Sequence, residues 1–233
     1  MSDSTTPAGF PIYASGSTDA ARAIIVLQEA FGVNDHIRGV TDMFADEGYL
    51  AVAPQLFHRD GSPEISYDDF ASAMPFMANL TKQGLTNDLN ATTDFLATLG
   101  FHAPNIAAVG FCMGGSVSFF AATLGTVGAA ASFYGGGVAT GRFGLAPLIE
   151  LAADLKSPWL GLYGDLDQSI PVEQVEALRV ATDAASVATE IVRYREGKHG
   201  FHCDARPDSF NQAAAMDARG RALAFFAEHL RDR

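Results

Sequence analysis

One cysteine of this chain stands in a setting that usually activates a nucleophile. Residues 106–116 read IAAVGFCMGGS, an apolar strand followed by a tight turn and the start of a helix, with Cys112 at the turn. The pattern G-x-C-x-G-G has the form of a nucleophile elbow that carries sulfur in place of oxygen. Gly110 and Gly114 leave room for the turn, and the first amides of the helix point at the atom under attack. The pattern indicates covalent catalysis, and a buried core cysteine is the alternative on this segment alone.

An acid and a base follow the cysteine in the order that such enzymes use. Asp165 and Asp167 come after an apolar strand at 158–163, and His199 follows a strand at 187–194. A free thiol has a pKa of about 8.5, so it needs a base, and a histidine oriented by a carboxylate provides one. Both aspartates are candidates for the acid at this point.

Length and composition describe an ordinary soluble enzyme. The chain has 233 residues, 48% of them hydrophobic and 18% charged, which is enough for one large core. We expect a flexible segment at 1–9 and a single domain at 10–233. The net charge of −12 argues against nucleic-acid binding. Cys112 and Cys203 are the two cysteines and cannot form a disulfide framework, which indicates a reducing, cytoplasmic location.

A long uncharged segment needs an explanation of its own. No charged residue occurs from 105 to 141, a length that would suffice for a membrane span. Glycines interrupt the segment repeatedly, so a strand, the elbow helix and a second strand buried in a sheet explain it better. We therefore expect no membrane association.

The elements that position these groups are predicted from the hydrophobic pattern, in which strand-like and helix-like segments alternate along the chain. Strands are expected at 22–29, 49–53, 106–110, 129–134, 158–163 and 187–194, with a further short one near 10–14. Helices are expected at 34–47, 67–99 with an interruption near Gly84, 113–124, 171–185 and 209–230. This alternation predicts the α/β class, a mostly parallel sheet of about seven strands with helices on both faces. The candidate catalytic groups all follow strand ends, where such sheets place their sites.

Four separated blocks resemble the dienelactone hydrolase (carboxymethylenebutenolidase) family of the α/β-hydrolase superfamily. They are QEAFGVN at 28–34, GFCMGG at 110–115, Gly164 with Asp167 and Pro171, and HGF at 199–201. The resemblance implies an α/β-hydrolase fold and a triad of Cys112, Asp167 and His199 that needs no metal or cofactor. It favours Asp167 over Asp165 as the acid. It also implies that a lactone or activated ester is hydrolysed through an acyl-thioester.

The resemblance assigns further roles near the elbow. Glu29 matches a glutamate that contacts the resting thiol and helps to deprotonate it when substrate arrives. The backbone amides of Met113 and Ala30 are expected to form the oxyanion hole. Phe31 and Tyr134 are expected to line the substrate pocket, although core packing explains Phe31 equally well.

The chain departs from the family where the substrate carboxylate should bind. The family carries an arginine between the second strand and the elbow, and residues 62–84 contain none. Arg59 is a possible substitute. A second family arginine would fall four residues after His199, where this chain has Cys203, and Arg206 on the same loop could replace it. Whether the substrate is anionic therefore stays open.

Other functions are weighed against this one. Class I glutamine amidotransferases also use a cysteine elbow, but their histidine is followed two residues later by glutamate, where this chain has Phe201. An inactive or binding-only scaffold and a redox-sensing thiol are further alternatives. His199, His202 and Cys203 do not make a persuasive metal site, because no further ligand cluster accompanies them. We expect a small-molecule partner and a monomer or weak homodimer.

Overall fold

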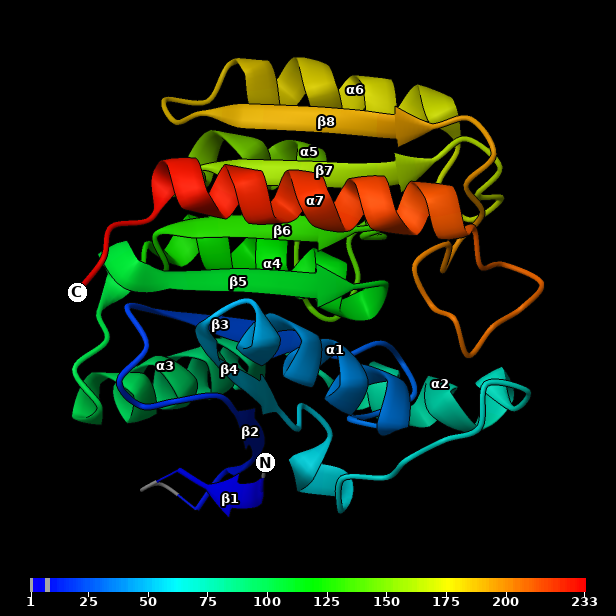
Figure 1. The fold of residues 1–233 in the computed structure, drawn as a ribbon. Coiled ribbons are helices and arrows are strands. Elements are labelled where there is room, and N and C mark those ends of the chain that lie inside the picture. The colour runs from blue at the N-terminus through cyan, green and yellow to red at the C-terminus, as the bar shows by residue number, and fades with distance from the viewer. Residues whose placement is uncertain (1, 7–8) are drawn as a thin grey trace.

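Eight strands form one sheet, and helices cover both of its faces (Figure 1). The computed structural model describes residues 2–6 and 9–233. The strands are β1 (Ser2–Thr5), β2 (Pro11–Ser15), β3 (Arg22–Leu27), β4 (Tyr49–Pro54), β5 (Ile106–Phe111), β6 (Ala129–Phe133), β7 (Trp159–Gly164) and β8 (Thr189–Tyr194). The helices are α1 (Asp35–Asp46), α2 (Phe70–Asn79), α3 (Lys82–Thr98), α4 (Met113–Leu124), α5 (Leu148–Leu151), α6 (Val172–Asp183) and α7 (Gln212–His229).

The sheet follows the order β1-β2-β4-β3-β5-β6-β7-β8. The two pairs formed by β2 are antiparallel and the other pairs are parallel. Figure 1 shows α1 and α7 in front of the sheet and α4 behind it. This is the mostly parallel α/β-hydrolase architecture that the sequence predicts.

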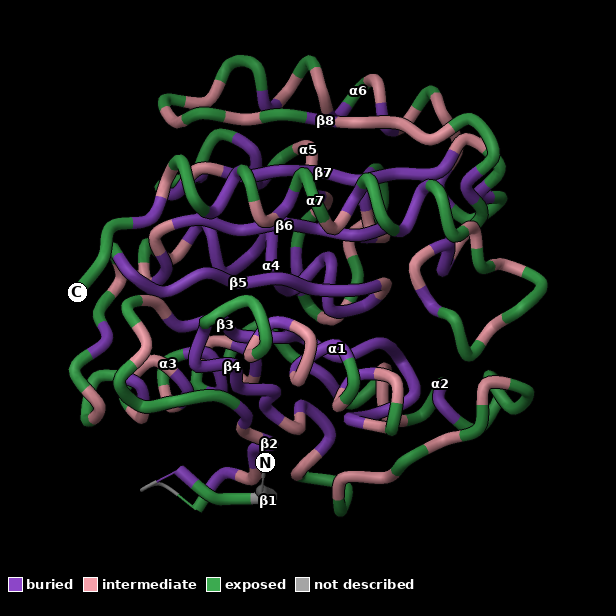
Figure 2. The backbone as a smooth tube through the Cα atoms, in the orientation of Figure 1, coloured by how far each residue is buried: buried purple, intermediate pink, exposed green. Residues whose placement is uncertain are grey.

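The uncharged segment forms the centre of the molecule. Its residues build β5, α4 and β6, and every residue of the two strands is buried, as the purple tube in Figure 2 shows. A parallel strand covered on both faces is apolar along its whole length, which accounts for the missing charges. Within the described residues, no helix is long and apolar enough to cross a membrane.

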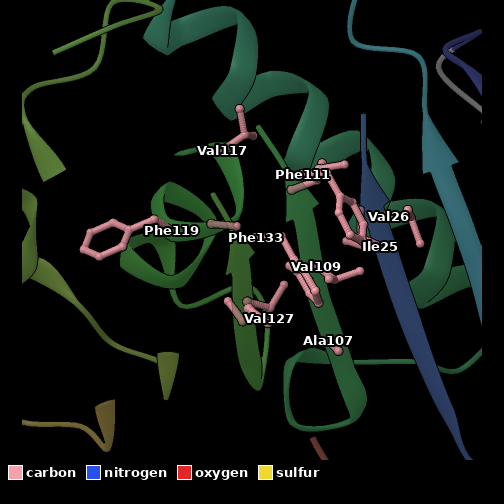
Figure 3. Close-up of a cluster of buried hydrophobic side chains, with 14 of the residues drawn as sticks. Ile25, Val26, Ala107, Val109, Phe111, Val117, Phe119, Val127 and Phe133 are labelled. Atoms are coloured by element: carbon pink, nitrogen blue, oxygen red, sulfur yellow. The ribbon is translucent and has the colours of Figure 1, made fainter. Parts of the chain in front are cut away.

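Large side chains fix the central strands and the start of α4 in place. Figure 3 shows Ile25 and Val26 of β3 beside Val109 and Phe111 of β5, with Phe133 of β6 in the same cluster. The Phe111 and Phe133 rings lie 4.7 Å apart. Burying one such side chain contributes about 1.5–3 kcal/mol, so the strand ends that carry the site are firmly held.

The predicted helical segment 67–99 contains two helices, α2 and α3, and the break between them begins at Leu80, four residues before Gly84. Leu80 has extended backbone with ψ of 140°, and the Thr81 side chain caps α3 by accepting a hydrogen bond from the Gly84 amide. Gly84 therefore lies in the first turn of α3, and the interruption comes from the cap. By contrast, Asn34 caps α1 as predicted, with its side chain accepting from the Ile37 amide.

The first residues of the chain differ from the flexible segment expected at 1–9. Ser2–Thr5 form β1, which pairs with β2 and brings the sheet to eight strands. Pairing needs only backbone groups, and it covers the edge that β2 would otherwise expose. Residues 1, 7 and 8, also part of that expectation, lie outside the described residues.

Candidate active site

Cys112 occupies a strained turn between β5 and α4. Its backbone has φ of 55° and ψ of −114°, a conformation that residues other than glycine rarely adopt. A Cβ on Gly110 would lie 1.9 Å from the Gly114 carbonyl oxygen, and one on Gly114 would lie 2.2 Å from the Leu27 carbonyl oxygen. The turn therefore requires both glycines. As the sequence predicts, the elbow lifts one thiol above the carboxyl edge of the sheet.

Hydrogen bonds tie the elbow to both neighbouring strands. The Cys112 amide donates to the Phe133 carbonyl at 3.0 Å, and the Gly114 amide donates to the Gln28 carbonyl at 3.0 Å. Trp159 Nε1 donates to Ser132 Oγ at 2.8 Å, and Ser132 Oγ donates to the Gly115 carbonyl at 2.7 Å. The strain at Cys112 persists because the structure around it is fixed from both sides.

The acid and the base meet beside the elbow. His199 Nδ1 donates to Asp167 Oδ2 at 2.6 Å. Asp167 is buried, and its Oδ1 accepts from the Ser169 amide at 2.8 Å and from Ser169 Oγ at 2.6 Å. Burial alone would raise the pKa of Asp167, but the hydrogen bonds from His199 and Ser169 outweigh it and hold that pKa below its usual value. Asp167 is thus an ionised carboxylate that orients an imidazole.

Asp165 pairs with an arginine instead of with His199. Its two oxygens accept from Arg193 at 2.7 and 2.9 Å. Of the two aspartates that the sequence offered, only Asp167 hydrogen-bonds His199 within the described chain. Ser169, two residues further on, supports the acid and was missed in the sequence; a hydroxyl two positions after the acid is the signal that could have found it.

The charge of the nucleophile acts on the imidazole. Burial alone would lower the pKa of His199, but the negative charge of Cys112, the bond to Asp167 and a hydrogen bond with Cys112 raise it to about 10. The raised pKa favours the imidazolium form of His199 beside the elbow, so the base carries a proton that it can donate.

Tyr134 differs from its expected place in the substrate pocket. It is fully buried with φ of 41°, and its ring packs edge-on against the His199 ring at 5.1 Å. It is absent from the pocket walls, because the turn after β6 directs the ring beneath the imidazole. Tyr134 therefore supports His199 from behind.

A cavity of about 590 Å³ opens above the thiol. Its walls are mostly apolar and include Phe31, as the sequence predicts. The cavity is also lined by Phe70, Phe143, Arg142, Lys198 and Arg206. Cys112, Asp167 and His199 lie at the same cavity, so a carbonyl bound there can reach the sulfur.

Arg206 is the candidate carboxylate-binding arginine that the sequence places on the same loop as His199. It lines the cavity with its guanidinium 5.9 Å from the Phe31 ring and 5.8 Å from the Tyr67 ring. No carboxylate pairs with it in the part of the chain that the structure describes. Arg142 lines the cavity as well and was missed in the sequence, although it follows the glycine-rich loop after β6. Two guanidinium groups thus face the site.

Arg59 is placed differently from its predicted role. Its guanidinium binds both oxygens of Asp88 at 2.7 and 2.8 Å, and it lines a separate cavity of about 260 Å³. Asp88 is a buried carboxylate of α3, and a buried charge needs a counter-ion. The ion pair with Asp88 therefore holds Arg59 away from Cys112.

The two expected oxyanion donors are free to act. Among the described residues, neither the Met113 amide nor the Ala30 amide donates a hydrogen bond within the protein. They lie on the two segments that the Gly114–Gln28 hydrogen bond joins, one on each side of the elbow. Their role in the reaction stays a prediction.

Glu29 lies behind the elbow, fully buried. Its Oε2 accepts from the Tyr67 hydroxyl at 3.0 Å, and no hydrogen bond joins it to Cys112 in the described structure. Its other neighbours are His36 and Cys203. The sequence suggested Cys203 beside His199 and His202, whereas the fold brings it to Glu29. Tyr67 lies 38 residues from Glu29, and neither it nor His36 carried a sequence signal.

Comparisons with known proteins identify the family. A family model described as "Dienelactone hydrolase family" matches residues 10–230. A Salmonella typhimurium protein named "Putative carboxymethylenebutenolidase" is 37% identical over 219 residues, covering 91% of this chain and 79% of its own. An Escherichia coli protein of the same name is 37% identical over 214 residues, covering 88% and 76%. A Klebsiella pneumoniae crystal structure titled "Putative Dienelactone Hydrolase" is 33% identical with a TM-score of 0.85, covering 97% of this chain and 98% of its own.

Proposed function

The chain belongs to the dienelactone hydrolase family and is a carboxylic ester hydrolase, and on that premise we propose that it opens lactones or activated esters through an acyl-thioester on Cys112. The observation that carries the proposal is the 2.6 Å hydrogen bond between His199 and Asp167 beside a thiol at an open cavity. Both the nucleophile and a means to activate it are present.

The proposed reaction has two halves. The Cys112 thiolate attacks the carbonyl carbon, and the Met113 and Ala30 amides stabilise the resulting oxyanion. As the carbon–oxygen bond breaks, His199 gives its proton to the leaving alkoxide, which in a lactone stays attached to the acyl group. His199 then removes a proton from water, which attacks the thioester and releases the carboxylic acid and the thiolate. The acid loses its proton to solvent. Asp167 holds Nδ1–H throughout, so Nε2 is left for these transfers.

The cavity supports a small, partly apolar substrate that carries a negative charge. Phe31, Phe70 and Phe143 supply apolar walls, and Arg206 and Arg142 supply positive charge. A substrate carboxylate bound to Arg206 would place an adjoining lactone ring near Cys112. An anionic lactone is therefore the proposed substrate class, in place of a neutral ester.

Glu29 is proposed to assist when substrate binds. Its Oε1 has no hydrogen-bond partner among the described groups, so it is available to accept a proton. The bond from Tyr67 to Oε2 orients the carboxylate. To reach Cys112, Glu29 would have to rotate from this position.

Covalent trapping tests the proposal. Intact-mass spectrometry during turnover of a slowly deacylated activated ester should show one acyl adduct on the wild type and none on Cys112→Ala. Cys203→Ser is the matched control and should keep the adduct. Turnover by a folded Cys112→Ala variant, or an adduct that follows Cys203, would refute the nucleophile assignment. An inactive scaffold predicts no adduct on any variant.

A further inference from the structure

A second group of reactive side chains lies inside the protein and contributes nothing to the walls of the substrate cavity. It is the buried cluster of Glu29, His36 and Cys203, whose carboxylate oxygen, imidazole nitrogen and sulfur all lie within 4.8 Å of one another. Glu29 and Cys203 are 0% exposed, and the His36 side chain is 5% exposed. Glu29 and His36 lie seven residues apart and Cys203 comes from the loop after β8, so the fold brings the third member to the other two.

Two polar atoms of the cluster lack hydrogen-bond partners. Glu29 Oε1 and His36 Nε2 are both buried, and neither makes a hydrogen bond within the described chain. Glu29 also lacks a Lys or Arg partner among the residues that the structure describes. A buried carboxylate oxygen and a buried imidazole nitrogen without partners both cost stability, so a cation that bonds both atoms would stabilise the cluster.

Neighbouring groups hold the free atoms in place. Asp204 Oδ1 lies 3.0 Å from His36 Nδ1, which sets the proton on Nδ1 and leaves a lone pair on Nε2. Tyr67 donates to Glu29 Oε2 and leaves Oε1 unbound. Metal-binding histidines often hydrogen-bond a carboxylate through their other nitrogen, and metal-binding carboxylates also accept hydrogen bonds, as His36 and Glu29 do here.

We propose that Glu29 Oε1, His36 Nε2 and Cys203 Sγ form a binding site for a zinc-class divalent cation. Zinc binds oxygen, nitrogen and sulfur donors together. Calcium and magnesium prefer oxygen ligands alone, so this set of donors disfavours them. Ligand atoms around tetrahedral zinc lie about 3.4 Å apart, so the side chains would close inward by about 1 Å on binding.

The cation can reach this site without crossing the substrate cavity. A separate hollow of about 380 Å³ is lined by His36, His202 and Asp204. On binding, the Cys203 thiol loses its proton to solvent and the thiolate bonds the metal.

The metal would also restrain Glu29. This consequence rests on the proposed function, in which Glu29 assists Cys112. A carboxylate bonded to zinc keeps its Oε1 away from the nucleophile, so the cation acts as an inhibitor that never enters the substrate cavity.

The binding test uses reduced Cys112→Ala protein, which lacks the other thiol and the hydrolase activity, so its result is independent of the proposed function. Zn²⁺ competition against a chromogenic chelator should give one equivalent bound. Adding Cys203→Ser or His36→Gln should each weaken binding by about 100-fold or more, whereas adding His102→Gln, an exposed histidine, should change nothing. Co²⁺ should give a thiolate charge-transfer band that Cys203→Ser abolishes. Absence of stoichiometric binding, or binding unaffected by both ligand variants, would overturn the site.

The inhibition test uses the protein with Cys112 intact. Zn²⁺ should inhibit hydrolysis by the wild type, a chelator should reverse the inhibition, and His36→Gln should be at least about tenfold less sensitive. Equal sensitivity of the two proteins would show that zinc acts at Cys112 itself and would overturn the inhibitory role.

Discussion

The two polar groups on either side of Cys112 are built in opposite ways. Asp167 and His199 are hydrogen-bonded to each other, and Ser169 gives Asp167 further donors. In the buried cluster, Glu29 and His36 each keep an atom without a partner among described groups. A satisfied network fixes one protonation state, whereas an unsatisfied one is stabilised by whatever supplies the missing charge. The acid–base pair is thus held in one arrangement for catalysis, and the buried cluster is arranged to respond to a bound cation.

Tyr134 packs on one of these groups and feels the charge of the other. Its ring packs on His199. Burial raises the pKa of its hydroxyl, and the charges of Glu29, Cys203 and Cys112 raise it further. Tyr134 is therefore a neutral side chain beside the base.

The largest expected effect comes from breaking the acid–base pair. Asp167→Asn should lower kcat by about a thousand-fold or more, because the imidazole loses its orienting charge and its correct tautomer. Steady-state kinetics would measure this, with Asp165→Asn as the control. Asp165 pairs with Arg193, so its loss should alter kcat only severalfold. The reverse ranking would make Asp165 the acid.

The second effect is on stability and again concerns the acid–base pair. Against the effect of burial, the negative charge of Cys112 and the hydrogen bonds with Asp167 and Cys112 raise the pKa of His199 from the ordinary 6.5 to about 10. A base whose pKa is raised by folding stabilises the folded state below pH 6.5, and that stabilisation is lost as the pH rises through about 10. Urea unfolding should show the wild type losing stability over this window, and Cys112→Ala should lose less. Parallel pH profiles of the two proteins would show that Cys112 carries no charge beside His199.

The third effect separates the two predicted arginines. Arg206→Ala should raise KM for a carboxylate-bearing lactone by about 10- to 150-fold, since a charge-assisted hydrogen bond contributes about 1.5–3 kcal/mol. Its KM for the neutral methyl ester should not change. Arg59→Ala should leave both KM values alone and lower the free energy of unfolding, because Asp88 loses its partner. Equal KM values for the two substrates on the wild type would remove the anion-binding proposal.

The smallest effect comes from the support of the buried cluster. Tyr67→Phe removes a hydrogen bond from Glu29 and should cost about 1–2 kcal/mol of unfolding free energy. Tyr194→Phe, which loses a more exposed bond to Asp217, should cost less. Chemical denaturation at constant pH compares the two. A larger loss at Tyr194 would mean that the bond from Tyr67 adds little to the cluster.

Sequence patterns predicted the family, the fold and the meeting of Asp167 with His199, because each of these depends on local signals at strand ends. They failed where the partner is distant. Arg59 pairs with Asp88, 29 residues away, and nothing in the sequence marks that need. β1 pairs through its backbone without a hydrophobic pattern. His36 reaches Cys203 only through the packing of α1 against the loop after β8, so the buried cluster could not be foreseen.

The glycines of the elbow place unequal limits on how such a protein can evolve. Single substitutions at Gly110 or Gly114 would drive new atoms into the backbone, so selection should remove them before any other change can compensate. Cys112 faces the open cavity, and another small side chain there meets no such barrier. Descendants of this enzyme can therefore exchange the attacking atom, and with it the chemistry, in one genetic step while the turn that presents it is inherited unchanged.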